Sequence, residues 1–187
     1  LQLFYEFCIR EQITDIQLLE LEQETAFQNY LKQKVEKEQR RKRLKTIVET
    51  ARKVMFIQTD GIRWDATIWY LERFHIAKER INQSDSIEKI SFQEVLQPKN
   101  RLLLQEYMKY EIGIGELALS TVYERFRTIR NFLQEISEQQ IEVTKCDVNR
   151  IDAYLKNLQN GAMGAKTFNT NVSGIQFFMK FLEVKGY

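Results

Sequence analysis

The residues best suited to chemistry are hydrogen-bond donors spaced along one predicted helix between positions 120 and 133. Only Glu124 among them supplies negative charge, so this face suits the phosphates of an anionic partner. Ser120 or Thr121 is a candidate N-cap, which would add free backbone N–H groups and the positive end of the helix dipole. The alternative is an ordinary solvated face, because surface arginines usually contact only water. The donors are Tyr123, Arg125, Arg127, Thr128, Arg130 and Asn131.

A second set of donors opens another predicted helix, near residue 166. Lys and Asn side chains can bond base edges in the DNA major groove, and Thr can reach a phosphate or a thymine methyl group. Gly174, in the middle of this helix, would allow close packing against a neighbouring helix. Asn169 could instead satisfy a local backbone group. The candidate residues are Lys166, Thr167, Asn169 and Thr170.

A third candidate surface is the most basic segment of the chain, residues 32–45. In this segment Lys and Arg clearly outnumber the two acidic residues, Glu36 and Glu38. A cluster at its centre is a candidate phosphate clamp, and several phosphate contacts would make DNA affinity fall steeply with salt. Basic residues at a helix start are unfavourable for the helix dipole, which favours a functional role over a merely solubilising one. The cluster consists of Arg40, Arg41, Lys42 and Arg43.

Apolar residues must position the donors between positions 120 and 133. They recur every three or four residues and predict one buried stripe on an amphipathic helix. The chain has one proline and seven glycines among 187 residues, too few for a loop-rich or β-rich protein, whereas strong helix formers abound. The sequence therefore predicts an all-α fold. The stripe is formed by Val122, Phe126, Ile129, Phe132, Leu133 and Ile136.

The first part of the chain shows three helix signals. One apolar pattern ends near Ile9, and Asp15 is a candidate cap for a second helix. A third helix is predicted over residues 38–58, and Gly61 is a suitable stop for it. These helices would carry the basic cluster on an exposed face.

The middle of the chain is harder to assign. Residues 64–81 are predicted to form a further helix, in which Trp69 and the single histidine, His75, pack inside. The polar run at residues 82–86 is the best linker candidate. Residues 91–94 have the form of a capping box, which would begin the next helix.

Residues 100–187 carry a succession of helix ends, turns and helix starts. No single motif is diagnostic, but their order and spacing are consistent. In chain order the motifs are Glu106-Tyr107-Met108-Lys109, Ser120-Thr121, Ile141-Glu142-Val143-Thr144, Asp147-Val148, Tyr154-Leu155, Lys166-Thr167-Phe168-Asn169, residues 177–182 and Lys185-Gly186-Tyr187. By this succession the segment resembles the core-binding, SAM-like domain that precedes the catalytic domain of tyrosine recombinases, the phage-integrase family.

The resemblance implies three parts. Residues 99–187 would form the core-binding domain, and residues 63–98 a helical connector. Residues 1–62 would form a degenerate, partial repeat of the same plan, because both segments have a turn with Ile and Thr and a helix closing in Tyr-Leu-Lys. Helical sequences of biased composition can mimic one another, which is the competing explanation. The matched triplets are Tyr30-Leu31-Lys32 and Tyr154-Leu155-Lys156.

The resemblance also implies a function, which is sequence-specific binding of double-stranded DNA for integration or recombination, in the manner of an integrase or transposase. In the family, two helices of this domain lie near the major groove, which would join the donors of residues 120–131 to those that begin at Lys166. Self-association on DNA, as a tetramer, is expected.

Catalysis by this segment is not expected. In tyrosine recombinases the catalytic residues lie in the domain that would follow Tyr187, and a His-x-x-Arg element is missing here. We therefore expect no catalytic residue, metal site or cofactor. The first residue is Leu and not Met, so the sequence has the character of a fragment.

Composition limits the remaining functions. The net charge is +2, so an anionic partner must be met by local patches. Cys8 and Cys146 are too few for a disulfide framework and lack the spacing of a zinc site, which favours a reducing, cytoplasmic setting. No apolar run has the length of a membrane span, so no membrane partner is expected.

The rival function is a helical protein–protein interaction module, in which exposed aromatic residues would anchor a partner and the arginines would be a polar rim. A helix-turn-helix regulator is discounted, because the sequence lacks a compact three-helix unit with a short turn. The candidate anchors are Trp64, Trp69, Tyr107 and Tyr123.

Overall fold

The computed structural model describes residues 1–82, 86–161 and 164–187. Over these residues the fold is all-α, with seven α-helices and one small two-stranded sheet. The chain divides into two compact units, the first made of Leu1–Arg73 and Glu88–Gln93, the second of Phe74–Ile87 and Glu94–Tyr187. Residues 63–98 are therefore shared between the units. The predicted linker at 82–86 lies largely outside the described residues.

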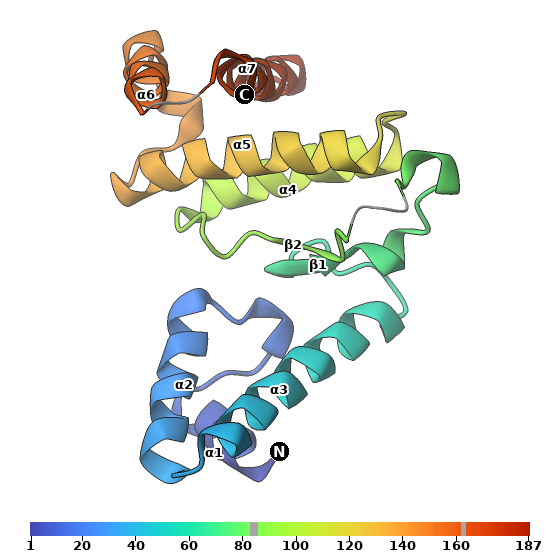
Figure 1. Cartoon of the computed structure of the whole chain (residues 1–187), viewed down its shortest axis with the longest axis vertical. Coiled ribbons are helices and arrows are strands. Elements are labelled where there is room, and N and C mark those ends of the chain that lie inside the picture. Colours follow the sequence, from blue (N-terminus) through green and yellow to red (C-terminus); the bar gives the residue numbers. More distant parts are fainter. Residues whose placement is uncertain (83–85, 162–163) are drawn as a thin grey trace. The chain divides into compact units, whose positions relative to one another are not determined.

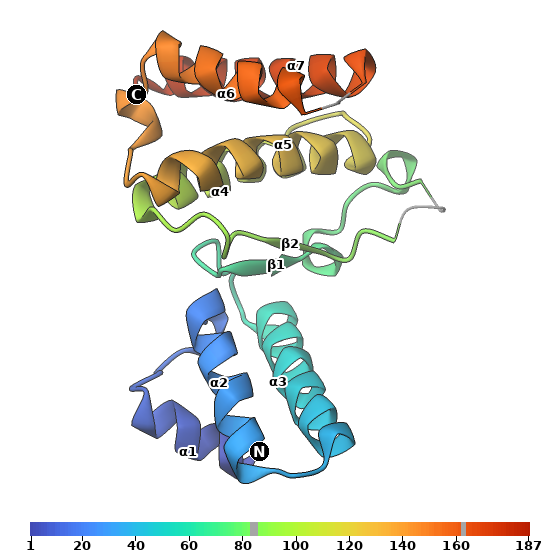
Figure 2. The ribbon, with the colours of Figure 1, turned by 60° about the vertical axis from the view of Figure 1, so that its left-hand side comes forward.

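The first unit contains three helices and the sheet, which Figures 1 and 2 show. Strands β1 and β2 pair antiparallel, with Ile68 opposite Ser91 and Tyr70 opposite Lys89. Short 3-10 turns lie at Ile16–Leu18 and Leu71–Phe74. The predicted helix over residues 38–58 is confirmed. The elements are α1 (Gln2–Arg10), α2 (Leu21–Lys34), α3 (Glu38–Gln58), β1 (Ile68–Tyr70) and β2 (Lys89–Ser91).

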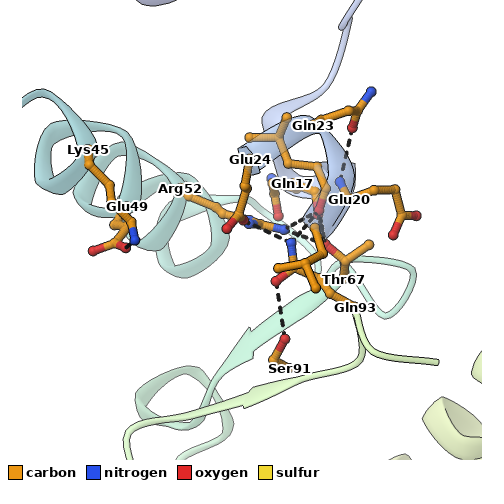
Figure 3. Close-up of polar contacts among 12 residues, drawn as sticks. Gln17, Glu20, Gln23, Glu24, Lys45, Glu49, Arg52, Thr67, Ser91 and Gln93 are labelled. Carbon is orange, nitrogen blue, oxygen red and sulfur yellow. Dashed lines mark hydrogen bonds and ion pairs between the residues drawn. The ribbon is translucent and has the colours of Figure 1, made fainter. Parts of the chain in front are cut away.

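A buried polar network joins α2, α3 and the sheet (Figure 3). Arg52 of α3 is 3% exposed and forms an ion pair with Glu24 of α2 at 2.5 Å. Its guanidinium also donates to the Leu19 carbonyl oxygen at 3.0 Å and to the Thr67 hydroxyl. The Gln93 amide donates to the same carbonyl oxygen and to the Glu24 carboxylate, each at 2.8 Å. Because buried polar groups are costly unless paired, this network specifies how these elements fit together.

The predicted helix over residues 64–81 is wrong. Ile68–Tyr70 is a strand buried on all three residues, and Trp69 packs edge-on against Phe92 with ring centroids 4.7 Å apart. Consecutive β-branched and aromatic residues favour a strand over a helix when a partner strand is available. His75 is exposed and has a positive φ of 47°, so it is not the packing residue expected.

The predicted starts of two other helices are also wrong. Asp15 caps only the short 3-10 turn, where its carboxylate accepts from the Gln17 N–H at 2.8 Å. Ser91 ends β2 instead of opening a capping box, because strand pairing occupies its backbone. The next helix begins at Pro98, where the Gln97 side chain accepts from the Asn100 N–H at 2.8 Å.

The second unit is built from four helices. Helices α4 and α5 run side by side, and α7 packs against both (Figures 1 and 2). The predicted apolar stripe of α5 is buried along its whole length, which confirms the amphipathic helix. The elements are α4 (Pro98–Gly113), α5 (Leu119–Glu138), α6 (Val148–Asn160) and α7 (Ala165–Lys185), with 3-10 turns at Lys78–Arg80 and Val143–Lys145.

Two buried or half-buried side chains secure the turns of the second unit. Asn100 is fully buried; its side chain accepts from the Val143 N–H and donates to the Ile141 carbonyl oxygen, each at 2.7 Å. Arg80 donates to the Glu111, Ile112 and Leu117 carbonyl oxygens at 2.8–2.9 Å. Carbonyl groups at a helix C-terminus have no partner within the helix, so Arg80 stabilises the end of α4.

Helices α1 and α5 end in the same kind of turn. Gln12 and Gln140 have positive φ values of 54° and 57°. The next residue, Ile13 or Ile141, donates its N–H to the carbonyl oxygen five residues earlier, at 2.8 and 3.0 Å. In both segments a 3-10 turn, a helix of 14 or 13 residues and a helix of 21 residues follow. The two segments thus share one order of elements.

An aromatic pair marks the same position in each segment. Phe4 packs edge-on against Phe27 at 5.0 Å, and Phe132 against Tyr154 at 5.1 Å. Phe27 and Tyr154 are each the seventh residue of a helix, counted from Leu21 and Val148. The Tyr-Leu-Lys triplets that suggested the repeat are therefore three residues out of register. Common descent of the two segments stays a prediction.

The Arg52 network can be tested by substitution. We expect Arg52→Met to lower the free energy of unfolding by about 3 kcal/mol, because Glu24 and the Leu19 carbonyl oxygen lose a buried partner. Arg43→Met, on an exposed position of the same helix, is the matched control and should change stability by less than about 0.5 kcal/mol. Urea denaturation followed by circular dichroism measures both, and equal effects would contradict the role of the network.

Tyr154 gives a pH-dependent prediction. Burial, reinforced by the Glu135 carboxylate, raises the pKa of Tyr154 from 10.0 to about 12. Between these values the unfolded chain loses the phenol proton while the folded chain keeps it, so the free energy of unfolding falls as pH rises. We expect Tyr154→Phe to reduce this fall in the free energy of unfolding at alkaline pH by about 2 kcal/mol.

The measurement is urea denaturation at several pH values between those two pKa values. Tyr5→Phe, at an exposed position, is the control and should follow the parent chain. If Tyr154→Phe loses stability with pH as steeply as the parent, the phenol is not the group responsible.

Candidate nucleic-acid interface

A polar groove runs between the N-terminal halves of α5 and α7. It brings together members of the two donor sets that the resemblance expected to cooperate, namely Thr121 and Arg125 with Lys166, Asn169 and Thr170, although they lie far apart in the sequence. The lining is rich in hydroxyl, amide and ammonium groups and has one carboxylate that is open to solvent, Glu124. The polar groove is lined by Thr121, Glu124 and Arg125 of α5 and by Lys166, Asn169, Thr170, Ser173, Gly174 and Phe177 of α7.

The floor of the polar groove depends on a close helix approach. A Cβ atom added to Gly174 would lie 3.0 Å from the Cγ2 atom of Thr128, closer than side chains normally pack. The predicted role of Gly174 in helix packing is confirmed. Thr128 is only 6% exposed, so its predicted DNA contact is wrong: the residue packs α5 against α7.

Arg125 lines the groove but is not a free cation. Its guanidinium forms an ion pair with Glu111 of α4 at 3.1 Å and lies 3.9 Å from the centroid of the Phe177 ring. The side chains of Arg125 and Glu111 are 18% and 7% exposed. Burial and the neighbouring Glu111 also raise the pKa of Tyr107 far above the usual tyrosine value. Arg125 therefore joins three helices and offers only part of its surface to a ligand.

Arg127 and Arg130 have different environments. Arg130 forms an ion pair with Glu94 at 2.9 Å and lies over the Phe126 ring, so it too is partly occupied by the fold. Arg127 is exposed, and its side chain has no partner among the described residues. It follows Glu124 by three residues, which places it on the solvent side of α5 next to the groove. Arg127 is the cation of α5 best placed for a phosphate.

The predicted N-cap of this helix is wrong. Helix α5 begins at Leu119, and Ala118 is its N-cap without a side-chain hydrogen bond. Ser120 and Thr121 therefore lie in the first turn; Ser120 is half-buried and Thr121 is exposed. Tyr123 is half-buried and stacks on Phe126. Thr121 remains available to a ligand because it lines the groove.

The start of α7 keeps most of its predicted donors exposed. Lys166, Thr167 and Asn169 are all exposed, and Gly164 caps the helix without a side chain. The Thr170 hydroxyl donates to the Lys166 carbonyl oxygen at 3.1 Å. Since a hydroxyl can accept while it donates, Thr170 still offers a lone pair. The N-terminus of α7 therefore presents cationic and hydrogen-bonding groups together.

The four residues of the basic cluster in the first unit have different environments. Arg41 donates to the Val35 and Glu36 carbonyl oxygens, each at 2.7 Å, and so holds the turn between α2 and α3. Lys42 pairs with Glu38 at 2.8 Å, which lowers the pKa of that carboxyl. Arg40 and Arg43 are exposed and lack a side-chain partner within the described part of the chain. Only these two remain candidates for a phosphate clamp.

Comparisons with protein-family models, curated proteins and solved structures found no match. The residues described contain no group of three or more His, Cys, Asp or Glu side chains that could hold a metal ion. Within the same residues, every helix is too short or too polar to cross a membrane.

Two anchors of the rival interaction module are not accessible. Trp69 and Tyr107 are buried, and Trp64 packs edge-on against Trp69 at 5.0 Å. Sequence reasoning missed the apolar residues that are exposed instead, among them Ile114 and Val184. The available signal in the sequence was their position: Ile114 follows the end of one helix, and Val184 lies in the last turn of another.

Arg125 and Arg127 should differ in their effect on stability. We expect Arg125→Ala to lower the free energy of unfolding by about 3 kcal/mol, because Glu111 would stay buried without its partner. Arg127→Ala should change it by less than about 0.5 kcal/mol. Urea denaturation of both variants is the measurement. Adding Glu111→Gln to Arg125→Ala should recover part of the loss, and no recovery would contradict the ion-pair explanation.

Proposed function

We propose that the second unit binds double-stranded DNA through the polar groove between α5 and α7. The observation that carries the proposal is that members of two donor sets, chosen from the sequence for DNA contact, line one surface. The groove offers hydrogen-bond donors with one solvent-open carboxylate among its lining residues. Such a surface fits a polyanion whose base edges present acceptors.

Each exposed residue has a chemical role in this proposal. Lys166 and Asn169 reach base edges, since Lys bonds guanine acceptors and Asn pairs with adenine. Thr121, Ser173 and Arg127 bind phosphates and set the register of the protein on the duplex. Arg125, held by Glu111 and Phe177, forms one wall and supplies part of its guanidinium edge.

The finer proposal is that the chain is the DNA-binding part of a tyrosine recombinase or transposase. In it, the second unit is the core-binding domain, a separate catalytic domain of the same protein cleaves and rejoins the DNA, and the protein assembles as a tetramer on paired sites. Arg40 and Arg43 of the first unit add a second phosphate contact. A cytoplasmic setting belongs to the proposal and is supported by Cys8 and Cys146, which are both free thiols.

The test is fluorescence anisotropy of a labelled duplex titrated with the full chain between about 50 and 200 mM salt. We expect affinity to fall log-linearly with salt and Arg127→Ala, which removes a phosphate contact, to reduce the slope by about 0.9. Lys166→Ala, which removes a base contact, should weaken binding and relax base preference. Asn169→Ala should weaken binding to a preferred site by about 1–3 kcal/mol and relax base preference. Lys156→Ala, an exposed lysine of α6 outside the groove, is the matched control.

Two outcomes would contradict the proposal. One is the absence of duplex binding even at the lowest salt concentration. The other is a loss in Lys156→Ala equal to that in Arg127→Ala and Lys166→Ala, because binding would then come from diffuse positive charge and not from the groove.

A further inference from the structure

A second groove lies in the same unit, at the opposite end of α7 from its N-terminus. It runs between the C-terminal part of α4, the loop that follows and the last turns of α7. Its lining is mainly apolar, in contrast to that of the polar groove. The side chains that give this apolar groove its character are Tyr110, Ile114, Leu117, Phe177, Phe181 and Val184.

The apolar groove is open to solvent to an unusual degree. Ile114 is 73% exposed and Val184 is 77% exposed, although both are large aliphatic residues. Tyr110 and Phe177, which flank them, are about half exposed. Scattered apolar residues on a surface need no explanation, but a contiguous set around one groove marks an interaction site.

The charges around the apolar groove select the kind of partner. Lys180 and Lys185 of α7 line it, and both are exposed. Glu111 is its only acidic lining residue among those described, and it is already paired with Arg125 at 3.1 Å. The apolar surface is thus bordered by positive charge that has no counter-ion within the groove. A partner with carboxylates beside its apolar residues would complement it.

We propose that the apolar groove binds an acidic amphipathic helix of a partner protein. A helix fits because apolar side chains at spacings of three and four residues can enter a groove between two helices. Its aspartates and glutamates pair with Lys180 and Lys185 at the border. This site is separate from the proposed DNA surface, with Arg125 and Phe177 forming the wall that the two grooves share.

The experiment uses a displayed library of random peptides about 16 residues long, some four helical turns, selected against the full chain. We expect enriched peptides to carry Asp and Glu beside apolar residues at helical spacing. Fluorescence anisotropy of an enriched peptide should show binding that weakens about tenfold or more in Ile114→Ser and in Val184→Ser. Leu102→Ser, at an exposed apolar position of α4 outside the groove, is the matched control.

Charge reversal tests the choice of partner. Lys180→Glu and Lys185→Glu should weaken binding of the acidic peptide. Lys156→Glu, on α6 outside the groove, should leave that binding unchanged. Selection that enriches no peptide, or only peptides insensitive to Ile114→Ser, overturns the proposal, as does enrichment of basic peptides. Binding of anionic vesicles lost in Ile114→Ser would assign the groove to a lipid surface and overturn it as well. Ile114→Ser should keep the DNA affinity of the parent chain. A negative result for peptide binding can therefore be told apart from a negative result for DNA binding.

Discussion

The packing of the second unit depends on one arginine, Arg125, whose side chain contacts the two helices beside its own. Arg125 projects from α5, pairs with Glu111 of α4 and lies over Phe177 of α7. The ion pair is partly buried, so its geometry is worth more to the specificity of packing than to net stability. With Gly174 and Thr128 bringing α5 and α7 close together, this contact fixes the wall between the polar and apolar grooves. Arg125 and Phe177 line both grooves, so a ligand in one groove would lie beside side chains that also border the other groove.

Arginine has two distinct uses in this chain. Arg41, Arg52 and Arg80 donate to backbone carbonyl oxygens, and such planar, multidentate donors replace the glycine and proline turns that the sequence largely lacks. Arg40, Arg43 and Arg127 have no such role and remain exposed. The number of arginines in a segment is therefore a poor measure of its capacity to bind phosphate. What matters is which guanidinium groups the fold leaves without a partner.

The two grooves of the second unit differ because the two ends of α7 differ. Its first turns carry Lys166, Thr167 and Asn169, and its last turns carry Phe181 and Val184 beside lysines. The helix start also has free N–H groups that attract anions, whereas its end is closed by Gly186 in a left-handed conformation. One helix thus presents a cationic, hydrogen-bonding end and an apolar end bordered by lysines.

The sequence by itself determined the elements whose signal is periodic. The buried stripe of α5, the extent of α3 and the close packing at Gly174 follow from residue spacing and size, which act along one helix. Spacing also selected the donors of α5 and α7 that line the polar groove. Local patterns of this kind need no knowledge of distant residues.

Only the tertiary structure decided what depends on a distant partner. Residues 68–70 form a strand because residues 89–91 pair with them, and no local pattern contains that partner. Thr128 is buried because α7 covers it, and Arg125 and Arg130 are occupied because Glu111 and Glu94 lie beside them. The physical reason is the same in each case: burial and pairing are set by contacts between segments far apart in the chain, whereas a sequence pattern records only the preferences of near neighbours.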